Sequence, residues 1–420
     1  MDNYNEFKRF VVGLVRGKIN ENNDIVSYLL GRHDPENEVV IYDKDVKEFY
    51  NLSRGVTGEN VEIFSDKSYE IGCFVENPLW VFSGDYPIVI EDKINKLKYK
   101  LGCPSLEYAS FIVSLMAKKF VEEKKKHTAS SMMLLRYLRT VDRGGEFSPQ
   151  KLFSWMVGIF SIQIESEENK KIEEFREYKS SIEFHLMYKG NTPVVSINKI
   201  DDLKNEIGDS YNLDLNGIDE PPLRKYDSNV MDYYKVALSS ESPYIKYISF
   251  YHVIEYYYEE VFRKNIINAI RGKITSPLFS YKNDDNIYEI ASFVKNRIKY
   301  HDESGQGNEK DSLEYVLKEY VNIDDLQKRI VELNHKAVDF YNNTQVVFCN
   351  GHAIHWKNEQ EVYKNISNRI YATRNSLIHS KSGRGRARYK PYDHEKILQK
   401  EIPLIRAIAE LVIINSSEII

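Results

Sequence analysis

Arg374, Asn375 and His379 are polar residues that occur within one six-residue stretch of a predicted helix. Successive helix residues are rotated by about 100°, so Asn375 and His379, four positions apart, lie on one face and can touch. Arg374 precedes His379 by five positions and lies about 140° away around the helix. Arg374 and His379 can therefore line the same pocket in only two ways. Either the long side chain of Arg374 reaches around the helix, or the two residues come from two copies of the chain that pack together.

These residue types suit the cleavage of RNA. A neutral imidazole can remove the proton of a ribose 2′-hydroxyl near neutral pH, and a guanidinium can stabilise the charge that develops on the attacked phosphate. Two such helices packed about a two-fold axis would bring two arginines and two histidines into one cleft. We expect His379 to be the acid–base catalyst, Arg374 to stabilise the phosphate, and Asn375 to orient His379 or bind substrate. No metal or other cofactor is needed.

The remainder of this helix indicates how the motif is presented. One narrow stripe is predicted to face the core: Ile366, Ile370, Thr373 and Leu377. A second stripe lies on nearly the opposite side: Asn368, Ala372, Asn375 and His379. His379 thus lies off the apolar face. This disfavours the interpretation that it is a buried core histidine whose hydrogen bonds have only a structural role.

The segment Arg374-Asn375-Ser376-Leu377-Ile378-His379-Ser380 resembles the signature of HEPN domains, an arginine followed by a polar residue and, after a few positions, by a histidine near a helix end. The segment from Ser242 to Tyr256 is similar to their early long helix, and Ile397–Ile414 to their last. The resemblance covers about Tyr226 to Ile420. It implies an up-and-down helical fold, an obligate homodimer, and frequently cleavage of tRNA or mRNA by a toxin or phage-defence effector, with a regulatory or antitoxin partner.

A basic segment follows the motif directly. It holds Lys381, Arg384, Arg386 and Arg388, interleaved with glycines and followed by Tyr389. The basic side chains could bind RNA phosphates and Tyr389 could stack on a base, which would make this segment a substrate-binding loop. The alternative is a solvated loop without a ligand.

Two other groups of polar residues offer weaker signals. His252 and Glu255 are three positions apart on a tyrosine-rich helix and could meet, which makes Glu255 a candidate for supporting the catalytic residues or a purely structural acceptor. Cys349, His352 and His355 have the spacing of metal ligands, but no fourth ligand is apparent, so we predict no metal. The sequence also lacks a phosphate-binding Gly-x4-Gly-Lys-Ser/Thr loop, which disfavours ATP-driven work.

Length and composition limit the class of protein. With 420 residues the chain is expected to form two domains, with three as the alternative, and 42% hydrophobic residues are typical of a globular protein. The net charge of −5 means that any RNA-binding surface must be local. Three cysteines without paired spacing favour a reducing compartment, and no apolar stretch is long enough for a membrane span. We therefore expect a cytoplasmic protein without membrane contact.

The elements that must position the motif lie in the second half of the chain. Pro221-Pro222 marks a boundary between a mixed α+β domain at 1–220, with a sensor or regulatory role, and a helical domain at 226–420. Strands are predicted in the first domain at 38–42, 61–64, 69–75, 80–82, 88–90, 182–188 and 194–197, and helices at 105–126, 130–138 and 152–164. Helices are predicted in the second domain at 232–238, 244–270, 287–300, 312–320, 323–341, 360–379 and 395–415.

Two functions remain open from the sequence. The first is a metal-independent endoribonuclease with a composite Arg/His site in a homodimer. The second is a non-catalytic helical dimer that binds RNA or a protein, with the polar helix stripe as its interface.

Overall fold

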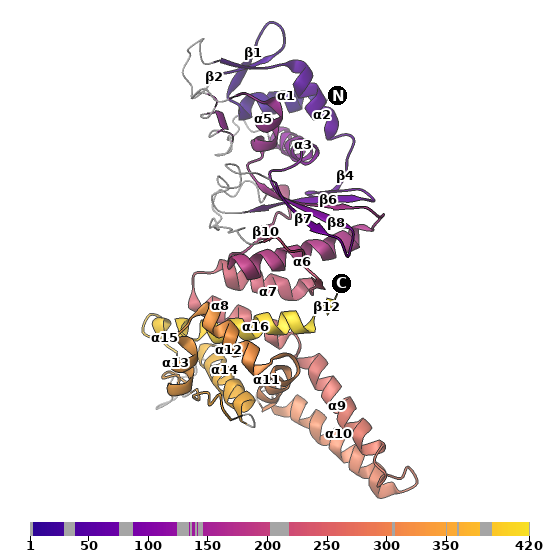
Figure 1. Cartoon of the computed structure of the whole chain (residues 1–420), viewed down its shortest axis with the longest axis vertical. Helices are drawn as coiled ribbons and strands as arrows, with labels where there is room; N and C mark the ends of the chain where they lie inside the picture. The colour runs from indigo at the N-terminus through magenta and orange to yellow at the C-terminus, as the bar shows by residue number, and fades with distance from the viewer. Residues whose placement is uncertain are drawn as a thin grey trace. The chain divides into compact units, whose positions relative to one another are not determined.

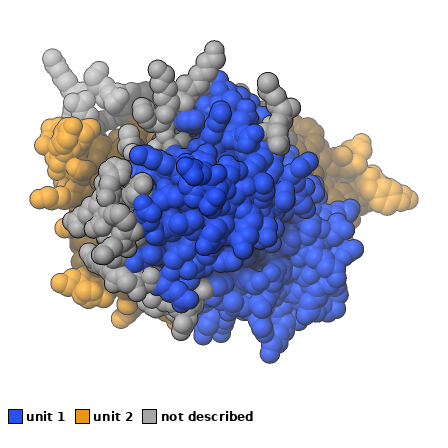
Figure 2. Space-filling model, turned by 90° about the horizontal axis from the view of Figure 1, so that it is seen from above, with its two compact units in different colours: residues 1–223, 420 blue, residues 224–419 orange. Residues whose placement is uncertain are grey.

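The computed structural model describes residues 3–28, 38–74, 87–123, 134, 137–138, 141, 146–201, 218–304, 307–349, 351–358, 361–378 and 389–419. The chain divides between Leu223 and Arg224 into two compact units, which Figure 2 colours separately. Sheets and helices make up the first unit, and the second is helical apart from one pair of two-residue strands. This confirms the predicted order of a mixed domain and a helical domain. Within the described ranges, none of the helices combines the length and the apolar content that a membrane crossing requires.

The N-terminal unit contains an antiparallel sheet with the strand order β4-β5-β6-β9-β8-β7, and β10 pairs with β6 (Figure 1). Its strands are β4 (Thr57–Glu59), β5 (Glu62–Phe64), β6 (Ser68–Phe74), β7 (Ile88–Asp92), β8 (Leu97–Gly102), β9 (Phe160–Ser166) and β10 (Val195–Ser196). A smaller antiparallel sheet consists of β1 (Gly17–Ile19), β2 (Ile25–Tyr28) and β3 (Glu38–Ile41).

The helices of this unit are α1 (Asn3–Leu14), α2 (Asp43–Leu52), α3 (Leu106–Glu122), α5 (Pro149–Met156) and α6 (Ile172–Gly190). Helices α1, α2 and α5 pack on α3. They share one apolar core, in which the rings of Phe49 and Phe153 stack with centroids 4.3 Å apart. Burial of this face explains why α1 and α2, which the sequence patterns did not predict, are stable helices.

Two sequence predictions in this unit are wrong. The predicted helix at 152–164 ends at Met156, because Gly158 adopts the left-handed conformation with φ 68°, and the chain continues as β9. The predicted strand at 182–188 lies inside α6, a helix that is buried on much of its circumference. The predicted strand at 80–82 and most of the predicted helix at 130–138 lie outside the described residues.

The C-terminal unit contains α7 (Ser228–Ser239), α8 (Pro243–Glu255), α9 (Tyr258–Ile274), α10 (Asp284–Ser304), α11 (Gly307–Tyr320), α12 (Ile323–Leu333), α13 (Ala337–Asn343), α14 (Val362–Ile378), α15 (Glu395–Gln399) and α16 (Ile402–Ser416). The strands β11 (Arg224–Lys225) and β12 (Glu418–Ile419) pair antiparallel. The apolar helix α16 packs on α8, α11 and α12. Helices α9 and α10 lie side by side and extend away from the other helices of the unit (Figure 1).

Three of the predicted long helices are divided in the structure. The segment 244–270 turns at Tyr256-Tyr257, so that Glu255 is the last residue of α8. The segment 323–341 is interrupted after Leu333, and 395–415 is interrupted before α16. Pro403 stands at the start of α16 and explains the last break, because proline cannot continue a preceding helix.

Candidate functional site

Helix α14 carries the Arg374 motif. The predicted apolar stripe is confirmed, since Ile366, Ile370, Thr373 and Leu377 are all buried. On the other side, Asn368, Ala372 and Asn375 are partly exposed. The helix ends at Ile378, so His379 follows directly after its last residue and lies outside the described residues.

The guanidinium of Arg374 is held by groups from three helices. On α11, Glu309 accepts from Nη1 through Oε2 at 2.9 Å and from Nη2 through Oε1 at 3.3 Å. On α8, the ring of Tyr251 lies beneath the guanidinium, with its centroid 5.1 Å from Cζ. The neighbouring Asn375 on α14 accepts from Nη1 at 3.1 Å. The Arg374 side chain is therefore only 12% exposed.

Glu255 connects Arg374 to an imidazole. Its Oε1 lies 3.6 Å from Nη2 of Arg374, and its Oε2 lies 2.8 Å from Nδ1 of His252. The two oxygens of one carboxylate thus contact the guanidinium and the imidazole. The predicted meeting of His252 and Glu255 is confirmed, and the structure adds the contact with Arg374, which helical spacing could not reveal.

The charges of this cluster do not favour an anion in the described arrangement. One guanidinium faces two carboxylates. Glu309 accepts hydrogen bonds from both Nη atoms of Arg374, the edge of the guanidinium that would otherwise bind a phosphate. The Nε atom of Arg374 is buried and has no hydrogen-bond partner among the described residues. A phosphate group would have to displace the carboxylate of Glu309 to reach both Nη atoms. In contrast, the side chain of His252 is 39% exposed and accessible to a ligand.

Tyr389 lies near the end of α14 but is not a free stacking surface. Its backbone N–H donates to Oγ of Ser376 at 2.8 Å. Its ring packs against Phe348, with centroids 5.4 Å apart, and lies 6.2 Å from the rings of Tyr244 and His394. Base stacking by Tyr389 stays a prediction. The predicted phosphate-binding residues Lys381, Arg384, Arg386 and Arg388 lie outside the described residues.

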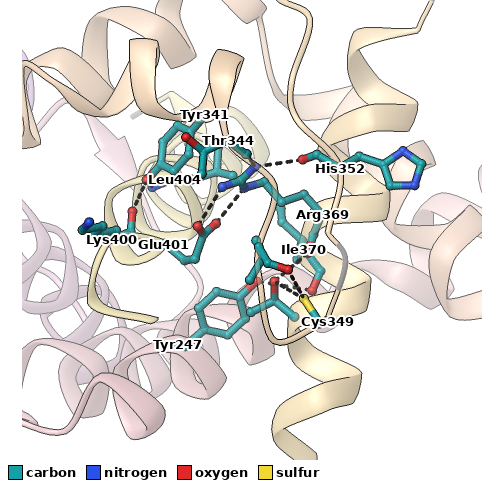
Figure 3. A network of polar contacts seen from close by, with 12 residues as sticks. Tyr247, Tyr341, Thr344, Cys349, His352, Arg369, Ile370, Lys400, Glu401 and Leu404 are labelled. Carbon is teal, nitrogen blue, oxygen red and sulfur yellow. Dashed lines mark hydrogen bonds and ion pairs between the residues drawn. The ribbon is translucent and has the colours of Figure 1, made fainter. Parts of the chain in front are cut away.

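Arg369 is a second arginine of α14, which the sequence patterns did not single out (Figure 3). Its side chain is completely buried. Its Nε and Nη2 donate to the carboxylate of Glu401 at 2.7 and 2.8 Å. Its Nη1 donates to the carbonyl oxygens of Thr344 at 2.6 Å and His352 at 2.8 Å. Burial raises the pKa of the Glu401 carboxyl, and the ion pair with Arg369 opposes that shift.

The Arg369 network has a structural role. Through the carbonyl groups of Thr344 and His352 it fixes the segment between α13 and α14 against the core of the helical unit. The sequence could have indicated this buried ion pair, because Arg369 lies between Ile366 and Ile370 on the apolar part of the helix. A charge at such a position must be paired inside the protein.

The suggested metal ligands are not gathered. The Sγ of Cys349 lies 3.5 Å from Oγ1 of Thr373, and burial raises the pKa of this thiol. His352 and His355 are exposed, and the ring of His352 points away from Cys349 (Figure 3). In the described part of the chain, no three His, Cys, Asp or Glu side chains are placed to hold a metal ion.

The site therefore consists of α8, α11 and α14 residues around one guanidinium, with a partly exposed imidazole at its edge. Of these residues the sequence suggested Arg374, Asn375 and Glu255, whereas Glu309 and Tyr251 are contributed by packing of the helices. No protein-family model, no curated protein and no solved structure matches this chain.

Proposed function

We propose that the helical domain, 226–420, is a HEPN-like, metal-independent endoribonuclease that acts as a homodimer. The observation that carries the proposal is the arrangement around Arg374. A guanidinium, a carboxylate and a partly exposed imidazole come together from α8 and α14, beside the helix end that leads into His379. These are the groups that RNA cleavage through the 2′-hydroxyl requires.

In this proposal His379 removes the proton of the 2′-hydroxyl, and the 2′-oxygen attacks the adjacent phosphorus. Arg374 stabilises the charge on the non-bridging oxygens through its two Nη groups. Asn375 orients His379 or the substrate, and Lys381, Arg384, Arg386 and Arg388 hold the RNA backbone. The products are a 2′,3′-cyclic phosphate and a 5′-hydroxyl.

Engagement of RNA has to release Arg374 from Glu309. A phosphate that enters between them exchanges one bidentate anion for another, so the guanidinium retains a complementary partner throughout. Pairing with a second copy of the chain, binding of a regulatory partner, or a signal from the N-terminal unit could favour this exchange. A toxin or phage-defence role, with tRNA or mRNA as target, is the biological setting that the HEPN resemblance suggests.

The test compares the wild type with Arg374→Ala and His379→Ala on end-labelled RNA. We expect each variant to lose on the order of 10²–10⁴-fold in cleavage while remaining folded. EDTA should leave the rate unchanged, because the steps use only protein side chains. His335→Ala is the matched control, since His335 is exposed in the turn before α13. Unchanged cleavage by His379→Ala would refute the proposal.

A second function is favoured by one observation, the near-complete pairing of Arg374 with Glu309 and Glu255. If that pairing persists with RNA present, the helical domain is a binding or interaction module rather than a nuclease. A gel-shift assay run beside the cleavage assay separates the two functions. Binding without cut products supports the module, and 2′,3′-cyclic phosphate ends support the nuclease.

A further inference from the structure

Helices α9 and α10 form a hairpin that extends away from the other helices of the helical unit (Figure 1). The base of the hairpin packs on α11, but none of residues 262–295, all of which the structure describes, is buried. Most of the stability of a helix in a protein comes from tertiary packing, which two helices in contact only with each other largely lack. The same stretch is nevertheless rich in apolar residues, which are Phe262, Ile266, Ile267, Ile270, Ile274, Leu278, Phe279, Ile287, Ile290, Phe293 and Val294.

The exposed isoleucines of α9 lie about a quarter turn away from α10. Ile266 is partly buried and lies on the side of α9 that also carries Lys273. This side faces α10, because Nζ of Lys273 lies 5.5 Å from the ring centroid of Phe293. Ile267 follows Ile266 by one position and is rotated from it by about 100°, and Ile274 lies above Ile267 two turns later. Both Ile267 and Ile274 are exposed.

The exposed isoleucine of α10 points to the same side of the hairpin. Ile290 and Phe293 are partly buried against α9, and Ile287 is rotated from their mean direction by about 90°, in the same sense as the exposed isoleucines of α9. The connection 275–283 reverses the chain, so the two helices are antiparallel. Equal rotations from the shared contact therefore bring three exposed side chains onto one surface, the hairpin face: Ile267, Ile274 and Ile287.

We propose that the hairpin face binds the hairpin face of a second copy of this chain, so that two hairpins form a four-helix bundle about a two-fold axis. A two-fold contact uses the same surface on both copies, and each isoleucine is then covered by apolar side chains of the other copy. The inference rests on the proposed function only for the homodimer, whose contact surface it names. It does not require nuclease activity.

The size of the hairpin face is sufficient for a stable pair. Helix α9 has 17 residues and is therefore about 26 Å long, and two helices side by side are about 20 Å wide. A face of this size on each copy gives a total buried area on the order of 1,000 Å², which is where specific interfaces begin.

The charges of the hairpin favour a second copy as the occupant. All charged residues between 261 and 283 are basic, namely Arg263, Lys264, Arg271, Lys273 and Lys282. Helix α10 begins with Asp284 and Asp285, which are exposed and form no ion pair within the described part of the chain. When two hairpins pair with their tips together, the basic end of each α9 crosses the acidic start of α10 of the other copy. The charges are then complementary on both sides of the axis.

An RNA partner fits this surface less well. The phosphate backbone would be attracted by α9 but repelled by Asp284 and Asp285, and phosphate contacts do not cover isoleucines. A second copy accounts for both the apolar residues and the two opposite charges.

The experiment measures the mass of the full chain by sedimentation equilibrium over a range of protein concentrations. The wild type should be a dimer, and Ile267→Glu/Ile287→Glu should raise its dissociation constant by on the order of 10²–10³-fold, because two charges enter the centre of the contact on each copy. Val331→Glu on α12 is the matched control, since Val331 and Ile287 are both 47% exposed. It should leave the dissociation constant unchanged. Circular dichroism checks that each variant retains its helices.

A second pair of variants tests the charge complementarity. Asp284→Asn/Asp285→Asn should raise the dissociation constant by about five- to tenfold at low salt and by less than about twofold at high salt, where the charges are screened. Asp324→Asn/Asp325→Asn removes the equivalent acidic pair from the first turn of α12 and controls for effects on helix stability. This control variant should dimerise like the wild type at both salt concentrations.

The possible results separate this inference from the nuclease proposal. A monomeric wild type at high protein concentration, or a dimer that persists in Ile267→Glu/Ile287→Glu, overturns the inference. Weaker RNA binding by this variant with an unchanged dimer also overturns it and identifies the hairpin as an RNA-binding arm. A wild-type dimer that the variant converts to monomers supports the inference, even if neither protein cleaves RNA and the proposed nuclease is thereby refuted.

Discussion

The guanidinium of Arg374 and the carboxylate of Glu309 face each other edge to edge, with Nη1–Oε2 and Nη2–Oε1 distances of 2.9 and 3.3 Å. The same edge of the guanidinium would bind the non-bridging oxygens of a phosphate. Glu309 is therefore a competitor of the substrate in the proposed reaction. Its side chain is 26% exposed, so exchange with a ligand needs no unfolding of the helical unit.

Substitution of Glu309 by Gln should accelerate RNA cleavage. The amide keeps the size of the side chain but removes the charge that holds Arg374. A partly exposed ion pair contributes on the order of 1 kcal/mol, which corresponds to roughly a fivefold gain in kcat/KM. The measurement is single-turnover cleavage of labelled RNA.

The matched control for this variant is Glu314→Gln, because Glu314 lies on the same helix and pairs with Lys318 at 2.6 Å. It should leave the rate unchanged. If Glu309→Gln instead loses activity together with thermal stability, Glu309 positions Arg374 rather than competing for it.

Arg374→Lys should be a poor replacement in spite of the retained charge. An ammonium cannot donate two parallel hydrogen bonds in the plane of a phosphate. We expect kcat/KM to fall by on the order of 10- to 100-fold, with a larger effect on kcat than on KM because the loss is greatest in the transition state. Steady-state kinetics provide the measurement, and Arg271→Lys on the exposed face of α9 is the control. Equal rates for Arg374→Lys and the wild type would argue against bidentate contact.

The buried pair of Arg369 and Glu401 should govern stability rather than catalysis. Arg369→Met leaves the Glu401 carboxylate buried without its partner and should destabilise the helical unit by about 3–5 kcal/mol. The double variant Arg369→Met/Glu401→Leu should recover much of this loss, because an apolar pair of similar volume has no charge to desolvate. Urea unfolding gives the free energies, and hydrogen exchange at 344–356 reports whether that segment is released.

A control for the Arg369 variants is Lys328→Met. Lys328 pairs with Asp325 at 3.3 Å on the surface, where both side chains are more than half exposed. The substitution should change the free energy of unfolding by less than about 0.5 kcal/mol. A comparably small effect of Arg369→Met would contradict a structural role for the pair.

Glu70 in β6 should make the stability of the N-terminal unit depend on pH. Burial raises the pKa of this carboxyl from 4.5 to about 7, although Ser105 donates to it from its backbone N–H at 2.9 Å and from its hydroxyl at 2.5 Å. The folded state thus binds the proton more tightly than the unfolded state. The contribution is complete below pH 4.5 and is lost as the pH rises through 7, by on the order of 3 kcal/mol.

Glu70→Gln tests this dependence, because glutamine stays neutral at every pH. The free energy of unfolding of the N-terminal unit, measured by urea titration between pH 4.5 and 8.5, should lose most of its decline above pH 6. Glu91→Gln, at an exposed position of β7, should retain the wild-type profile. A wild-type profile in Glu70→Gln would show that another group titrates.

Local patterns predicted some parts of the fold and failed in others. The apolar spacing of α14 placed Ile366 and Thr373 in the core, and this face is buried in the structure. The strand-like residue types at 182–188 were misleading. Helix α6 is buried on much of its circumference, so its apolar residues do not show the 3.6-residue period that distinguishes a helix from a strand. The helix predicted to continue beyond Met156 fails at Gly158, whose left-handed backbone redirects the chain into β9.

By itself, the sequence predicted that Asn375 and His379 lie opposite the apolar face of a helix at 360–379, because helical geometry fixes the relative positions of residues a few places apart. Only the tertiary structure decided what surrounds the guanidinium. Glu309 is 65 positions away from Arg374 in the chain, and Glu255 comes from yet another helix. Such contacts depend on how α8, α11 and α14 pack, which is decided by their buried faces together, and no local pattern of a single helix contains that information.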